Sequence, residues 1–154
     1  MSYRRVYESF WTDPHVLSLP SNSKYLFLYF ITNPLAHLSG IYYLPFSLLK
    51  DQSGLDLPTL NKNIARLIDQ GHIRYDRQYQ VIWVIRQLKN ELEKPKLAKE
   101  KGKEKEISDL TLKGIAYHLH SLHHCPLIYD FLQYYHRFMI PYNDNSKPLA
   151  SPSE

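Results

Sequence analysis

The chain has 154 residues, of which 44% are hydrophobic and 22% charged, enough apolar material for one compact domain and a small appendage. One cysteine excludes an internal disulfide framework, and no apolar run is long enough for a signal peptide or a membrane span, so we expect a cytoplasmic protein with no membrane partner. The formal net charge of +4 lies wholly in residues 1–90, with ten Lys/Arg and six Asp/Glu, whereas residues 91–154 hold nine of each.

The first elements are marked by helix-capping residues and breakers. Thr12-Asp13-Pro14 predicts a helix start, and Ser21-Asn22-Ser23 can cap a buried helix over residues 24–32, which Asn33-Pro34 ends. Residues 40–45 predict a short strand between breakers, and residues 46–52 a short helix that stops near Gly54.

A longer helix follows from Pro58 to Gln70, because proline favours the first helical turn and Gly71 is typical of a helix end. Two β-rich runs, residues 73–75 and 81–85, are joined by a short polar segment and predict a hairpin. The order helix, strand, helix, helix, hairpin is that of a winged helix. We therefore expect a mainly α fold with a small β-hairpin (α+β), with a winged helix-turn-helix DNA-binding domain in residues 1–90.

The second part of the chain changes in composition. Residues 91–106 interleave charges of both signs and predict a solvated linker. Residues 107–142 predict a C-terminal extension of two short helices broken at Cys125-Pro126, the first with an apolar face at Leu110, Leu112, Ile115, Leu119 and Leu122. Residues 143–154 are rich in Asn, Ser and Pro and are expected to be a disordered tail.

The helix over residues 58–70 carries the main functional prediction. A helical wheel places Leu60, Ile64, Leu67 and Ile68 on an inner face, and an outer face is then made of Thr59, Lys62, Asn63 and Arg66, with Gln70 at its edge. These outer side chains suit phosphates and base edges in a DNA groove. Any solvated helix has a similar polar face, so this face alone is weak evidence for DNA binding. The order of the neighbouring helices and the hairpin is the stronger evidence.

Further DNA contacts are expected outside that helix. Arg74 and Arg77 lie in the predicted hairpin, and Arg4 and Arg5 can form an N-terminal arm.

The sequence gives no support for an enzyme or a cofactor. His118, His120, His123, His124 and Cys125 cluster, but a closed metal site needs a further ligand and the spacing matches no familiar finger. The five glycines are scattered without a phosphate-binding loop, and no third group orients a Cys–His pair. We therefore expect no metal, no cofactor and no catalytic residues.

Several stretches resemble winged-helix replication proteins of phages and prophages and are similar to the N-terminal domains of DnaD-type replisome organisers. The matching stretches are residues 10–13, 17–19, 24–34, 40–45, 67–76 and 81–83, and a later match covers residues 125–142. Most of these positions are structural residues of a hydrophobic core and do not identify a catalytic or binding site. In one departure, DnaD-type proteins have a larger C-terminal helical domain, whereas this chain has two short helices, as a shorter accessory or regulatory protein would.

The resemblance implies binding of double-stranded DNA at a replication origin, self-association into a dimer or higher homo-oligomer, and recruitment of a replicative helicase or its loader. A transcriptional regulator that uses the same helix and wing is an alternative, since a fold does not set a function. A protein–protein assembly module of the primosome without DNA contact is another, because the 13 tyrosines suit interfaces.

Overall fold

The computed structural model describes residues 2–92 and 107–144. It is mainly helical with a small three-stranded antiparallel sheet, so the α+β class is confirmed. The N-terminal elements are η1 (Glu8–Trp11), α1 (Pro14–Leu17), α2 (Ser21–Thr32), β1 (Ile41–Tyr43), α3 (Phe46–Ser53), α4 (Leu57–Asp69), β2 (Ile73–Asp76), β3 (Val81–Val84) and α5 (Gln87–Leu92). The C-terminal elements are α6 (Asp109–His120), α7 (Leu127–Tyr134) and η3 (His136–Phe138). Most of the predicted linker and of the predicted tail lies outside the described residues.

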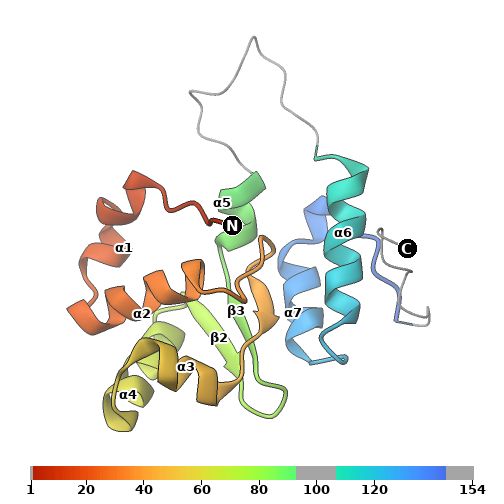
Figure 1. Ribbon diagram of the computed structural model, residues 1–154. Helices are drawn as coiled ribbons and strands as arrows, with labels where there is room; N and C mark the ends of the chain where they lie inside the picture. The colour runs from red at the N-terminus through yellow and green to blue at the C-terminus, as the bar shows by residue number, and fades with distance from the viewer. Residues whose placement is uncertain (1, 93–106, 145–154) are drawn as a thin grey trace.

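Helix α2 is the centre of the N-terminal core, against which α3 and α4 pack (Figure 1). The Tyr25 hydroxyl donates to the carbonyl of Ser53 (2.8 Å), and the Tyr29 hydroxyl donates to Gln52 Oε1 (2.7 Å), which fastens α2 to α3. The helix begins at Ser21, three residues earlier than the predicted Lys24, with Pro20 as its N-cap. The predicted cap residue Ser23 is instead buried inside the helix, where its hydroxyl bonds to α4.

The sheet has the strand order β1-β3-β2, so β1 adds a third strand to the predicted hairpin. The central strand β3 pairs Trp83 with Ile41 on one side and with Arg74 on the other. All four β3 residues are buried because both sheet faces are covered. Ile82 and Val84 contribute to the N-terminal core, whereas Val81 and Trp83 contribute to a second core on the opposite face.

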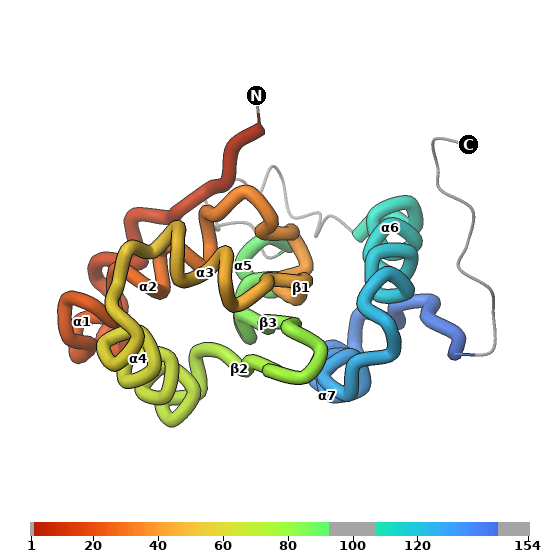
Figure 2. Tube along the Cα trace, turned by 60° about the horizontal axis from the view of Figure 1, so that its bottom comes forward, coloured from red at the N-terminus to blue at the C-terminus, as the bar shows by residue number. Residues whose placement is uncertain are grey.

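That second core is built by α6 and α7, which pack on the sheet face away from α2, α3 and α4 (Figures 1 and 2). The Tyr135 hydroxyl donates to the carbonyl of Ile85, and Nε2 of His118 donates to the carbonyl of Ile41 (2.6 Å). Leu110 is 75% exposed, contrary to its expected place on the apolar face of the first C-terminal helix, because the buried stripe of α6 begins only at Ile115. In residues 2–92 and 107–144, no helix has the length and apolar character needed to cross a membrane.

Candidate nucleic-acid interface

Helix α4 has a strongly defined start. The Asp56 side chain accepts hydrogen bonds from the backbone N–H of Thr59 (3.2 Å) and from its hydroxyl (2.7 Å), and these two bonds lower the pKa of the Asp56 carboxyl. Pro58 stands in the first turn, where its missing N–H costs nothing. The hydroxyl of Thr59, a predicted DNA contact, is therefore already engaged in capping the helix.

The buried face of α4 differs from the predicted one. Leu60, Ile64 and Leu67 are buried as expected, but Ile68 is 41% exposed and Asn63 only 4% exposed. The prediction that Asn63 lies on the outer face is therefore wrong. Its Oδ1 accepts from the Ser23 hydroxyl of α2 (2.6 Å), and its Nδ2 donates to the carbonyl of Thr59 (2.7 Å), so this polar side chain is satisfied inside the core.

The outer face of α4 retains two of the predicted basic side chains. Lys62 is exposed and Arg66 is partly exposed, one helical turn apart. Among the described residues neither has a carboxylate partner. Ala65 and Asp69 are exposed on the same face. The carboxylate of Asp69 therefore lies at the C-terminal end of this face, beside the exposed Gln70. Figures 1 and 2 show α4 at the far edge of the molecule from α6 and α7.

The hairpin places Arg77 beside the same helix. Its Nη2 donates to Oδ1 of Asn61 (2.9 Å), and its guanidinium lies 4.9 Å from the ring centroid of Phe46 in α3. A guanidinium has five N–H donors, so most of them remain available for another acceptor. Sequence reasoning did not single out Asn61 or Phe46, because their roles depend on a hairpin sixteen or more residues further along the chain.

The remaining predicted arginines lie elsewhere. Arg74 makes an ion pair with Asp130 of α7 (2.6 Å), because its position opposite Trp83 directs it to the sheet face that α7 covers. Arg4 donates to the carbonyl of Ala36. Arg5 is exposed, and its interactions with Tyr3 and Tyr7 raise its pKa. The N-terminal segment runs well away from α4 in both views (Figures 1 and 2).

The histidine cluster is divided among separate contacts. His118 stacks on His37 with ring centroids 3.6 Å apart, and His120 stacks on Tyr142 at 4.5 Å. Cys125 is buried, and burial raises its pKa to about 11, so its thiol is protonated at neutral pH. In the part of the chain that the structure describes, no three His, Cys, Asp or Glu side chains are grouped to hold a metal ion.

Comparisons with protein-family models, with curated proteins and with solved structures found no match to this chain.

Proposed function

We propose that this chain is a winged-helix protein that binds double-stranded DNA through the outer face of α4 and the tip of the β2–β3 hairpin. In this assignment α2, α3 and α4 form the trihelical core and the hairpin is the wing. The observation that carries the proposal is the pair Lys62 and Arg66, which lie one turn apart on α4. Lys62 is exposed, Arg66 is partly exposed, and neither has a carboxylate partner among the described residues. Arg77 lies beside Asn61 of this face and extends it.

The spacing of these three cations suits a DNA groove. Lys62 and Arg66 are one turn apart, so both can meet phosphates or base edges along one groove. Arg77 comes from a different element and can reach an adjacent phosphate. Contacts of this kind release counterions, so affinity would fall steeply with salt. Asn63, Arg74 and Arg4 are left out of the proposed interface, because Asn63 is buried, Arg74 is paired with Asp130 of α7, and Arg4 is bonded to the carbonyl of Ala36, away from α4.

The biological role that we propose is initiation of phage or prophage DNA replication, as an origin-binding protein, replisome organiser or helicase-loading accessory. This role rests on the resemblance to DnaD-type organisers. It includes self-association into a dimer or higher oligomer and recruitment of the replicative helicase or its loader.

The DNA contact is tested by the double variant Lys62→Ala, Arg66→Ala, with binding to a labelled duplex followed by fluorescence anisotropy. Loss of two phosphate or base contacts should weaken binding by about tenfold or more at low salt. The matched control is Lys89→Ala, Lys113→Ala, which removes the same charge from exposed positions on α5 and α6 and should bind nearly as wild type.

Two results would contradict the proposal. If the α4 double variant is folded by circular dichroism and binds as tightly as wild type, α4 is not the contact face. If the wild-type chain is oligomeric and has no affinity for duplex at low salt, the assembly module without DNA contact is the better assignment.

A further inference from the structure

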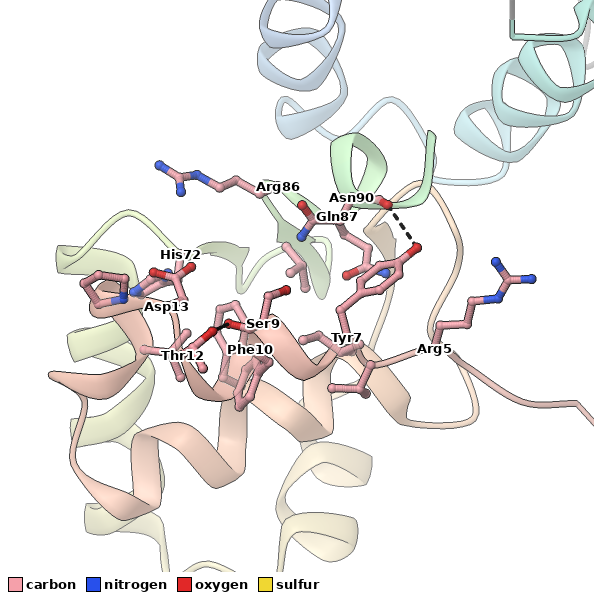
Figure 3. A pocket seen from close by; sticks show the side chains of 16 residues that line it. Arg5, Tyr7, Ser9, Phe10, Thr12, Asp13, His72, Arg86, Gln87 and Asn90 are labelled. Carbon is pink, nitrogen blue, oxygen red and sulfur yellow. Dashed lines mark hydrogen bonds between the residues drawn. The ribbon is translucent and has the colours of Figure 1, made fainter. Parts of the chain in front are cut away.

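A cavity of about 590 Å³ lies between the N-terminal segment, α2 and the junction of β3 with α5 (Figure 3). Its volume is within the range of pockets that hold small molecules. One wall is the chain from Arg5 to Val16, and the Tyr7 hydroxyl donates across the cavity's end to the carbonyl of Asn90 (3.3 Å). The DNA interface proposed above uses none of the side chains that line it.

The inner surface of this cavity is mostly apolar. Phe10 and Phe27 have ring centroids 5.5 Å apart, and the rings of Phe27 and His72 lie nearly perpendicular with their centroids 5.1 Å apart. Further apolar contacts come from Val6, Val16, Ile31 and Val84. The aromatic or aliphatic part of a ligand would be transferred here from water to an apolar surface, which is favourable.

The charged groups at the cavity favour an anion. Two guanidinium groups, those of Arg5 and Arg86, line it against one carboxylate, that of Asp13. Asp13 is partly engaged, since its Oδ1 accepts from the N–H of His15 (2.8 Å) as the N-cap of α1. Arg86 is exposed and has no carboxylate partner in the described part of the chain.

The two ends of the cavity differ. Figure 3 shows Arg86 on the side of His72 and Asp13, and Arg5 beyond Tyr7. Burial and the nearby charges of His15 and Arg86 lower the pKa of His72, so its ring is neutral at pH 7 and adds no charge. The available cation at the His72 end is therefore Arg86.

We propose that this cavity binds a small organic carboxylate, with its apolar body on Phe10 and Phe27 and its carboxylate on the guanidinium of Arg86. A guanidinium can hold a carboxylate through two parallel hydrogen bonds. Nothing in this arrangement requires the protein to bind DNA, so this proposal is tested independently of the proposed function.

The test uses the full chain and two matched probes, 2-naphthoate and its neutral isostere 2-naphthamide, in a titration followed by ¹⁵N-resolved NMR. We expect naphthoate to bind with a Kd of about 1 mM or tighter, and naphthamide about tenfold more weakly, because only the first has the charge. Amide shifts should change at His72, Val84 and Gln87 and stay unchanged in α6.

Arg86→Ala should remove the preference for naphthoate while leaving the fold intact, since its side chain is exposed. Lys113→Ala removes the same charge from α6 and should keep the preference. The proposal is overturned if naphthoate does not bind at about 5 mM, if naphthamide binds equally well, if Arg86→Ala keeps the preference, or if the shifts map to another surface.

Discussion

One hydrogen bond between side chains of α2 and α4 accounts for a polar residue on the buried face of α4. The Ser23 hydroxyl and the Asn63 amide meet in the interface between α2 and α4, and both side chains are almost fully buried. A buried polar pair is stabilising only when both members are satisfied. Asn63 meets this condition through Ser23 and the Thr59 carbonyl, which is why this polar residue is tolerated on the buried face rather than on the predicted outer face.

Removal of either partner should therefore destabilise the protein. We expect Asn63→Ala and Ser23→Ala each to lower the free energy of unfolding by about 1–3 kcal/mol, because each change leaves a buried polar group unpaired or removes its bond. The double variant should cost less than the sum of the two, as urea unfolding in a double-mutant cycle would measure. Strictly additive losses would mean that the two side chains do not interact.

His37 and His118 make stability depend on pH. Burial, then the nearby charge of His118, lowers the pKa of His37 to about 3, and burial also lowers the pKa of His118. Below the ordinary value of 6.5 the unfolded chain binds protons that the folded chain does not, so stability is present above that value and is lost as pH falls toward 3.

Between about pH 7 and pH 5, the free energy of unfolding should fall by about 2 kcal/mol through His37, with His118 acting in the same direction. Urea unfolding at the two pH values measures the loss. His37→Gln should make it smaller, whereas replacement of the exposed His123 by Gln should not. A loss of the same size in both variants would contradict the role of the stacked pair.

At the scale of elements, the local signals predicted most helices and strands. Caps and breakers such as Asp13-Pro14, Pro58 and Gly71 lie at the observed ends of α1 and α4. What these signals could not predict is pairing between distant segments. The addition of β1 to the hairpin and the docking of α7 on Trp83 depend on which faces meet after folding, and periodicity within one segment carries no such information.

The candidate site was predicted only in part for the same reason. Lys62 and Arg66 follow from the wheel of α4, and both have the expected exposure, at least in part. The sequence predicts Asn63 on the outer face because asparagine is polar. Its burial is tolerated because it bonds to Ser23, which lies forty residues earlier in the chain. Arg74 and Arg77 are three residues apart but lie on different sides of the molecule. Arg74 stands opposite Trp83 on the sheet face covered by α7, whereas Arg77 reaches Asn61 of α4.

Two glycines give a matched test of how β1 is joined to the rest of the fold. Gly40 and Gly71 have φ values of +81° and +77°. A Cβ at Gly40 would lie 2.6 Å from the carbonyl oxygen of Val84 and from Cβ of Gln87, whereas a Cβ at Gly71 would meet nothing within 4 Å. Gly71→Ala should therefore cost about 1–2 kcal/mol from the backbone conformation, and Gly40→Ala clearly more. Equal losses in chemical unfolding would contradict the close packing at the end of β3.

At the scale of the whole molecule, one small sheet supports two cores. Ile82 and Val84 of β3 face α2 and α4, and Val81 and Trp83 face α6 and α7. The C-terminal helices therefore cover the second face of the sheet rather than form an independent unit, and α4 lies at the opposite edge of the molecule (Figure 2).

A chain truncated after Leu92 should be less stable and prone to associate, because it exposes the apolar face that contains Ile41, Val81 and Trp83. Thermal unfolding and analytical ultracentrifugation measure these changes. The matched control is a chain that ends at Asp144, which keeps every described residue of both cores. A truncated chain that is monomeric and unfolds at the same temperature as the full chain would show that the second core contributes nothing to stability.

The proposed DNA contact is tested most directly by the salt dependence of duplex binding. The association constant of the wild-type chain should fall linearly with salt on a log–log plot, and Lys62→Ala, Arg66→Ala should lower the magnitude of the slope by about two, because each lost phosphate contact removes about one released counterion. An unchanged slope in this folded variant, or wild-type binding that does not respond to salt, would contradict a phosphate-contacting role for α4.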